Sequence, residues 1–246
     1  RDVERSRGLG DVYKRQQYPE QSDLALERKL EEKYGLTEAL IAVPAYEQSS
    51  DQEVAFQAVD YILRVLKKNM VFGMTWGRAM HEFVEQLAKD ERLRSLSFQN
   101  VKVVPFLGTP GAIQSDSWNT TTYSNTLATK VGNLLHCASY NLSAPMYVEG
   151  TKEKELIESI DEIAKVLHMA ETADIALIGI GSMQDDSSII KAEIRTKEEY
   201  KELVRKGAVG EIVGRIYDKN GQTVDEDLKR LSLIHISEPT RPLYIS

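Results

Sequence analysis

The residues with the clearest chemical potential lie in the stretch Asn69–Met80 (NMVFGMTWGRAM). Within it, an apolar run ends at a glycine, and the turn that follows contains Thr75, Trp76, Gly77 and Arg78. Such a turn supplies a hydroxyl, a flat aromatic face, backbone N–H groups and a fixed cation, which suit a polyhydroxylated or anionic ligand. The alternative interpretation is a solvated turn whose tryptophan packs into the core.

Hydrophobic periodicity places this turn between a strand and a helix. Met80, Phe83, Val84 and Leu87 recur at helical spacing and therefore form one buried face of a helix. In an open α/β sheet, the turns between strands and helices lie at the carboxyl ends of the strands, where ligands bind. The sequence thus predicts a ligand site at that edge of a sheet.

Strands and helices alternate along most of the chain. We expect helices over Asp23–Tyr34, Asp51–Lys67, Ala79–Leu87, Thr122–Leu135, Thr151–Met169 and Lys197–Val204. We expect strands over Ala39–Pro44, Asn69–Gly73, Val101–Leu107, Ala138–Leu142, Asp174–Ile180, Glu211–Tyr217 and Gln222–Val224, the last two flanking an Asn-Gly turn. This alternation predicts a three-layer α/β fold with a mainly parallel sheet and helices on both faces.

Composition excludes several classes of protein. The 246 residues are 41% hydrophobic and 28% charged, with a net charge of −7, which argues against a general nucleic-acid footprint. The single Cys137 permits no internal disulfide and favours a reducing, cytoplasmic compartment. We see no apolar run as long as a membrane span and no signal peptide.

The two ends differ from the middle of the chain. Arg1–Gln16 and Ser232–Ser246 show neither helical nor strand periodicity and resemble translated adapter sequence at the edge of an assembled reading frame. The alternative is that they are genuine, disordered ends. We expect a folded domain over residues 22–231, with residues 1–21 and 232–246 as non-native or disordered ends.

Several familiar motifs are incomplete. Gly179–Gln184 (GIGSMQ) begins like a dinucleotide fingerprint, but glutamine replaces the third glycine, and Gly108–Gly111 lacks the ending of a nucleotide-triphosphatase phosphate loop. His81, His136 and His168 do not have metal-ligand spacing. No nucleophile elbow is present. We therefore expect no cofactor, no metal and no catalytic residue.

Seven segments, taken in order, resemble one known family. They are Leu26–Pro44, Val71–Met80, Val101–Gly111, Ser124–Asn133, Leu142–Val148, Ala173–Met183 and Gly207–Val224. Together they are similar to the effector-binding domain of the SorC/DeoR family of bacterial sugar-responsive transcription regulators. The resemblance implies a fold like that of glucosamine-6-phosphate isomerase and ribose-5-phosphate isomerase. It also implies a sugar or sugar-phosphate ligand and a homo-oligomer. DNA binding would come only from an N-terminal helix-turn-helix domain of the parent, and further C-terminal sheet would follow Leu231.

The resemblance also implies which residues bind the effector. They are Thr75, Trp76, Gly77 and Arg78 in the first turn, Gly108, Thr109 and Gly111 in the next strand-end loop, and then Asn125 and Glu211. Gly181 and Ser182 join them because they too follow a predicted strand. For Glu211 the alternative is an exposed hairpin carboxylate. Phe106 and Leu107 stand where some members that answer to phosphorylated sugars place a basic residue, so an unphosphorylated sugar, a polyol or a monophosphate remains open.

Two classes of function fit these residues. The first is a non-catalytic sensor that binds a carbohydrate effector and changes the assembly of a regulator. The second is a phosphosugar isomerase or deaminase on the same fold, which needs a base close to a substrate carbon. Only Glu211 and Asp185/Asp186 could supply one, so the sequence favours the sensor. A purely structural oligomerisation module is a third, weaker hypothesis.

Overall fold

The computed structural model describes residues 23–43, 50–110, 120–148, 150–185 and 187–224. The two ends predicted to be non-native or disordered lie outside these residues, and so does Gly111. The helices are α2 (Leu24–Tyr34), α3 (Ser50–Val65), α4 (Arg78–Leu87), α5 (Ser124–Leu134), α6 (Thr151–Glu158), α7 (Asp161–Glu171), α8 (Ser188–Lys191) and α9 (Lys197–Arg205). The strands are β1 (Val71–Met74), β2 (Lys102–Pro105), β3 (Ala138–Ser139), β4 (Ile175–Leu177), β5 (Ile180–Ser182), β6 (Ala208–Ile212) and β7 (Arg215–Asp218).

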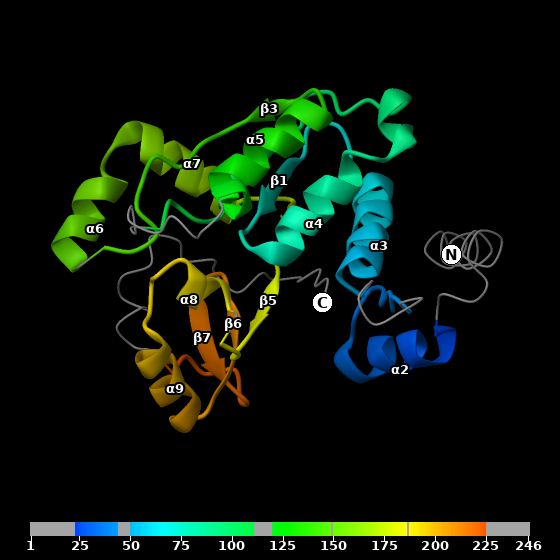
Figure 1. Ribbon diagram of the computed structural model, residues 1–246. Helices are drawn as coiled ribbons and strands as arrows, with labels where there is room; N and C mark the ends of the chain where they lie inside the picture. Colours follow the sequence, from blue (N-terminus) through cyan, green and yellow to red (C-terminus); the bar gives the residue numbers. More distant parts are fainter. Residues whose placement is uncertain (1–22, 44–49, 111–119, 149, 186, 225–246) are drawn as a thin grey trace.

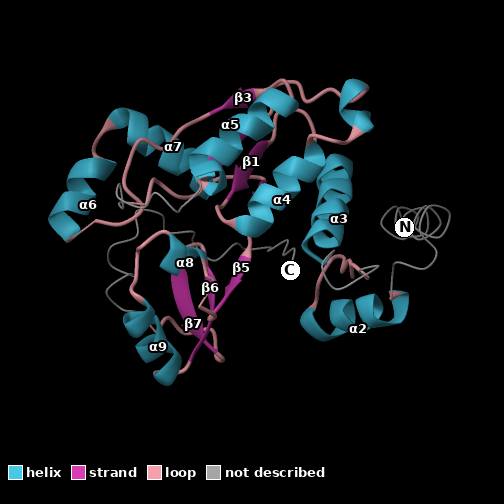
Figure 2. Ribbon diagram, viewed as in Figure 1, coloured by secondary structure: helices cyan, strands magenta, loops and turns pink. Residues whose placement is uncertain are grey.

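Four strands form a parallel sheet in the order β3-β2-β1-β4 (Figures 1 and 2). Successive side chains of a strand point to opposite faces. Phe72 and Met74 of β1 therefore pack with α3, α4 and α5, whereas Val104 of β2 and Phe106 just beyond it pack with α7. Helices cover both faces of the sheet, and the predicted three-layer α/β fold is confirmed.

A second, antiparallel sheet carries β5, β6 and β7, and α8 and α9 lie beside it (Figure 1). Trp76, Ile189, Tyr200 and Ile216 are among the buried side chains of the core that joins these elements. The expected single strand Asp174–Ile180 is therefore wrong, because its end belongs to another sheet. The chain leaves the parallel sheet after β4 and begins β5 at Ile180.

The expected strand Glu211–Tyr217 is also divided. Ile212 of β6 pairs with Arg215 of β7, so Val213 and Gly214 form a two-residue hairpin turn with φ of 53° and 75°. Turns of this kind need positive φ at both positions. Valine rarely adopts positive φ, so the sequence gives no sign of a turn here. The predicted Asn-Gly turn is present farther along, where the Asp218 N–H donates to the Gln222 carbonyl at 2.8 Å.

The predicted helix Thr151–Met169 consists of two helices. The first helix ends at Ser159, whose hydroxyl donates to the Leu156 carbonyl at 2.7 Å. The second helix, α7, begins just after Ile160. Leu156 and Ile160 are 68% and 44% exposed, so they do not continue the buried stripe that was expected. Ile163 and its helical neighbours in α7 are buried as predicted.

The predicted strand Ala39–Pro44 is absent from the part of this segment that the structure describes. Instead, the Ala39 N–H donates to the Glu31 carboxylate at 2.9 Å and the Ile41 N–H donates to the Glu27 carboxylate at 2.8 Å. These two carboxylates of α2 satisfy backbone donors that a sheet neighbour would otherwise bind.

The α4 helix agrees well with its hydrophobic pattern. Met80, Phe83, Val84 and Leu87 of α4 are all at most 5% exposed. The α2 helix begins after the capping side chain of Asp23 and ends at a left-handed glycine, Gly35. Among the described residues, no helix has the length and apolar character needed to cross a membrane.

Candidate functional site

A cavity of about 580 Å³ lies where β1 ends and the small antiparallel sheet begins. Its wall is formed by Asp51, Thr75–Ala79, Thr122, Gly179–Ser182, Ser187, Ser188, Lys191, Glu211 and Val213. The turn after β1 and the segment after β4 meet here because parallel strands end at the same edge of their sheet. Seven predicted site residues are brought together: Thr75, Trp76, Gly77, Arg78, Gly181, Ser182 and Glu211.

Thr75 fixes the end of β1 against the segment that leads from β4 to β5. Its N–H donates to the Leu177 carbonyl at 3.2 Å, and its hydroxyl accepts the Gly179 N–H at 3.3 Å. The side chain is 1% exposed. Thr75 therefore shapes the cavity wall chiefly by joining two backbone segments.

Gly77 and Arg78 start α4 at the edge of the cavity. Gly77 has φ of 103°, a left-handed value that glycine adopts without strain, and no side chain caps the helix at this residue. The exposed Arg78 guanidinium lies 3.4 Å from the Asp51 carboxylate. The positive end of the helix dipole and this cation both favour a negative group here.

Glu211 is the buried charged group of the site. Its side chain accepts hydrogen bonds from the Gly214 N–H and from the indole N–H of Trp76. Burial raises the pKa of Glu211 to about 7, while these two donors act in the opposite direction. Its partner across the sheet is Gly181, where a Cβ would lie only 2.6 Å from Glu211 Oε2. Glycine at this position therefore leaves room for the carboxylate.

Trp76 belongs to both the core and the cavity wall. It is 6% exposed and packs in the core beneath α8 and α9, in agreement with the alternative interpretation of a packed tryptophan. Its N–H nevertheless reaches Glu211, and the residue contributes to the cavity wall. Trp76 thus holds the Glu211 carboxylate through its N–H and does not present an exposed aromatic face.

Three predicted site residues lie outside this wall. A Cβ on Gly108 would lie 2.2 Å from the Ala144 carbonyl, and the Thr109 N–H donates to the same carbonyl at 2.9 Å. The Asn125 amide bonds both backbone groups of Leu142, at 2.8 and 3.1 Å. All three face the chain that follows β3 and do not line this cavity, so their role in effector binding stays a prediction. Gly111 lies outside the described residues.

Sequence reasoning missed Asp51, Thr122, Ser187, Ser188 and Lys191 in the cavity wall. Asp51 and Thr122 depend on tertiary placement and leave no local signal. The Ser187 side chain accepts the N–H of residue 190 at 3.3 Å as the cap of α8. That capping pattern could have revealed the short helix and hence its lysine.

Other candidate groups do not assemble. Within the described ranges, no cluster of three or more His, Cys, Asp or Glu side chains could hold a metal ion. Burial raises the pKa of the Cys137 thiol to about 11, which keeps it protonated at neutral pH. Asp185 is exposed and outside the cavity wall, and Asp186 lies outside the described residues.

Comparison with known proteins places the chain among regulators. A family model described as "Putative sugar-binding domain" matches residues 18–235. The chain is 28% identical over 235 residues to the sorbitol operon regulator of Klebsiella pneumoniae, covering 94% of this chain and 71% of that protein. It is 26% identical over 200 residues to the deoxyribonucleoside regulator of Bacillus subtilis, covering 80% of this chain but only 60% of that relative's length.

Solved structures agree with this assignment. The full-length sorbitol operon regulator SorC from Klebsiella pneumoniae matches with a TM-score of 0.72 and 26% identity, over 88% of this chain and 67% of that one. A DeoR family transcriptional regulator from Listeria monocytogenes has a TM-score of 0.71 and 23% identity, over 85% of this chain and 79% of that one, and supports the fold alone. These relatives are named as regulators and not as enzymes, which agrees with the expected sensor. The chain belongs to the sugar-binding domain family of SorC/DeoR transcriptional regulators.

Proposed function

We propose that this chain is the effector-binding domain of a bacterial transcriptional regulator and that the cavity beside Glu211 binds a sugar or a sugar phosphate. Family membership supports the class of ligand, and the names of the relatives support the regulatory role. The observation that carries the proposal is a buried carboxylate, oriented by the N–H groups of Trp76 and Gly214, in the cavity wall.

The cavity combines the groups that a polyhydroxylated ligand needs. A carboxylate has about four acceptor positions, so two N–H donors leave capacity on Glu211 for ligand hydroxyls. Arg78 and Lys191 contribute positive charge to the same wall, and the first turn of α4 adds its dipole. An anionic group on the ligand would compete with the exposed Asp51 carboxylate for Arg78.

Effector binding would act on the assembly of the whole regulator. A ligand shifts an equilibrium between assembled states only by its difference in affinity for those states. We propose that the domain forms a homo-oligomer in the cytoplasm and that a separate domain of the parent binds DNA. The net charge of −7 makes direct DNA binding by this chain unfavourable.

A panel titration tests the proposal. The protein is titrated calorimetrically with pentoses, hexoses, polyols and their monophosphates, and each mixture is then incubated and examined by NMR. We expect saturable binding of at least one compound without chemical conversion. Absence of binding across the panel contradicts an effector site, while conversion of a phosphosugar indicates the isomerase instead.

A further inference from the structure

The hairpin turn beside Glu211 is held on both sides by hydrogen bonds. The Gly214 N–H donates to the Glu211 carboxylate, and the Gly214 carbonyl accepts the Tyr147 O–H at 2.7 Å. One glycine therefore connects a carboxylate of the cavity wall to a tyrosine that does not belong to that wall.

The turn needs this support because its own residues specify it weakly. Val213 is β-branched and rarely adopts a φ of 53°, while Gly214 is free to adopt many other conformations. A Cβ at position 214 would lie 2.5 Å from the Tyr147 hydroxyl oxygen and 2.6 Å from the Met146 methyl group. Tyr147 thus packs directly onto the glycine whose carbonyl it binds.

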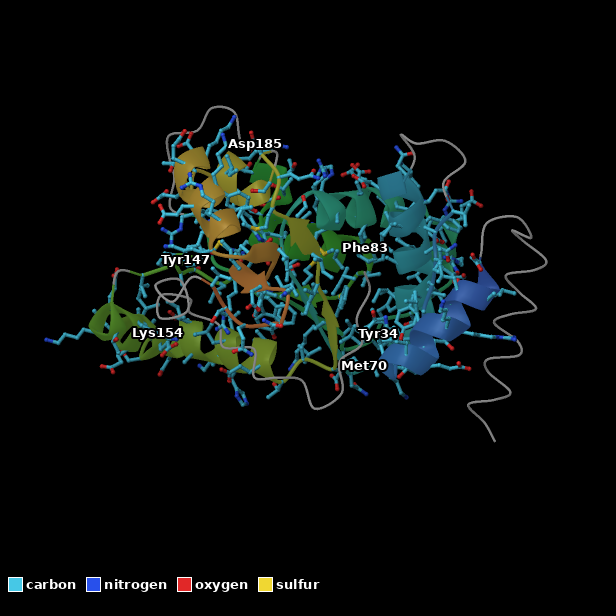
Figure 3. All side chains as sticks on the ribbon, turned by 90° about the horizontal axis from the view of Figure 1, so that it is seen from below. Tyr34, Met70, Phe83, Tyr147, Lys154 and Asp185 are labelled. Carbon is cyan, nitrogen blue, oxygen red and sulfur yellow. The ribbon has the colours of Figure 1, made fainter. Side chains whose placement is uncertain are left out.

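Tyr147 is itself well anchored. It lies in the chain between β3 and α6 and is labelled beside the orange strands of the small sheet in Figure 3. The preceding residue, Met146, is 2% exposed, and its N–H donates to the Thr109 carbonyl at 2.9 Å. The tyrosine hydroxyl is therefore presented to the hairpin from a fixed part of the α/β body.

We propose that Tyr147 is a positioning residue for Glu211, acting through Gly214 to hold one of the two N–H donors on the carboxylate. Without the Tyr147 hydroxyl, the Gly214 carbonyl loses this hydrogen bond and the turn gains freedom. The hydrogen bond from the Gly214 N–H to the Glu211 carboxylate is then formed in a smaller fraction of the molecules. The consequence for effector binding rests on the proposed function, but the effect on Glu211 does not.

The surroundings of Glu211 make this effect measurable. Trp76 faces it from the β1–α4 turn, Gly181 from β5 and Gly214 from the hairpin. The charged groups in the same cavity wall are Asp51 of α3, Arg78 of α4 and Lys191 of α8, and the phenol of Tyr147 lies behind the turn. The pKa of Glu211 follows from its burial and from its two N–H donors, so a weaker donor raises that pKa further.

The test follows the indole ¹⁵N–¹H signal of Trp76 in the unliganded full chain between pH 5 and 9. The protein contains two tryptophans, so a Trp118→Phe background leaves a single indole signal. We expect this signal to titrate near pH 7, as Glu211 ionises. Tyr147→Phe keeps the ring but removes the hydroxyl, and we expect its midpoint to rise by about 0.5 pH unit.

Two further variants sharpen the test. Tyr140→Phe is the matched control, because Tyr140 is a half-buried tyrosine of the same segment whose hydroxyl has no hydrogen bond to the described residues. The midpoint of this control should equal that of the protein with Trp118→Phe alone. Tyr147→Leu also removes the hydroxyl and keeps an apolar side chain, and it should raise the midpoint in the same direction.

The outcomes separate this inference from the proposed function. A lower melting temperature with an unchanged midpoint in both Tyr147 variants would show that the tyrosine is merely structural and would overturn the proposal, as would a lower midpoint. If the midpoint rises and a panel sugar binds about threefold more weakly to Tyr147→Phe, both proposals are supported. If the midpoint rises while no sugar binds the protein that keeps Tyr147, the positioning role stands and the effector site fails.

Discussion

The indole N–H of Trp76 donates a hydrogen bond to the buried carboxylate of Glu211. Trp76 follows β1, an inner strand of the parallel sheet, whereas Glu211 lies in the middle strand of the antiparallel sheet. This contact joins the two sheets within the cavity wall. A ligand that binds Glu211 would therefore contact a residue that links the two sheets.

The ionisation of Glu211 makes stability depend on pH. Its pKa rises from 4.5 to about 7 on folding, so between these values the folded state holds a proton that the unfolded state has released. This contribution to stability is complete below about pH 4.5 and is lost as the pH rises to about 7. We expect Glu211 to lower the free energy of unfolding by up to ~3 kcal/mol between pH 4.5 and pH 8.

Glu211→Gln tests this expectation, because it keeps a carbonyl oxygen for the two N–H donors but cannot ionise. Urea denaturation should show similar stability for variant and wild type near pH 5 and a more stable variant at pH 8, by roughly 2–3 kcal/mol. Glu202→Gln changes an exposed carboxylate of α9 and serves as the control. Parallel stability curves for wild type and Glu211→Gln across this range would contradict the assignment.

The end of α5 offers a stabilising substitution. His136 has φ of 51°, its N–H donates to the Asn133 carbonyl, and the next N–H donates to the Gly132 carbonyl. This is the Schellman arrangement, in which glycine is the preferred residue at the left-handed position. We expect His136→Gly to raise the free energy of unfolding by about 0.5–1 kcal/mol in urea denaturation. His136→Ala keeps a Cβ and should give no such gain; an equal gain would point to the loss of the imidazole instead.

Gly73 and Phe106 should be energetically coupled. A Cβ on Gly73 would lie 2.1 Å from Phe106 Cζ, so Gly73→Ala should destabilise the protein by roughly 2–3 kcal/mol through overpacking. Phe106→Leu relieves this clash. The double variant should therefore lose about 1 kcal/mol less free energy of unfolding, or better, than the two single variants lose together. Simple additivity in a double-mutant cycle would show that the ring moves aside at little cost.

The sequence predicted best those elements whose side chains alternate between core and solvent. The stripe on α4 is a local signal, and local physics decides it. The errors lie where tertiary contacts prevail. Glu27 binds the N–H of Ile41 in place of a sheet neighbour, and Val213 occupies a turn that its own preferences disfavour. Neither effect can be read from the residues alone.

Part of the cavity wall could also be predicted from the sequence. Thr75–Arg78 and Gly181 reach the cavity because parallel strands end at one edge, which is a rule of topology. Thr109 follows a strand of the same sheet, yet its backbone pairs with the segment before Met146, and it does not line the cavity. The approach of Lys191 depends on the packing of α8, which no periodicity reveals.

Arg78 should distinguish anionic from neutral effectors. Loss of a charge-assisted hydrogen bond in Arg78→Ala should weaken calorimetric binding of a sugar phosphate by about 1.5–3 kcal/mol, with a smaller effect on the neutral sugar. Lys89→Ala removes an exposed cation just beyond the other end of α4 and should leave both affinities unchanged. Equal losses for neutral and anionic ligands would place Arg78 away from any anionic group.

The central claim is that a carbohydrate binds in the cavity beside Glu211. The most direct measurement is a calorimetric titration of wild type, Glu211→Gln and Thr109→Ala with the tightest-binding compound of the sugar panel. We predict that Glu211→Gln weakens binding about tenfold or more, because the ligand hydroxyls lose a charged acceptor. Thr109→Ala, outside the cavity wall, should bind as wild type does. Wild-type affinity in Glu211→Gln together with weakened binding in Thr109→Ala would contradict the account and place the site at the other loop.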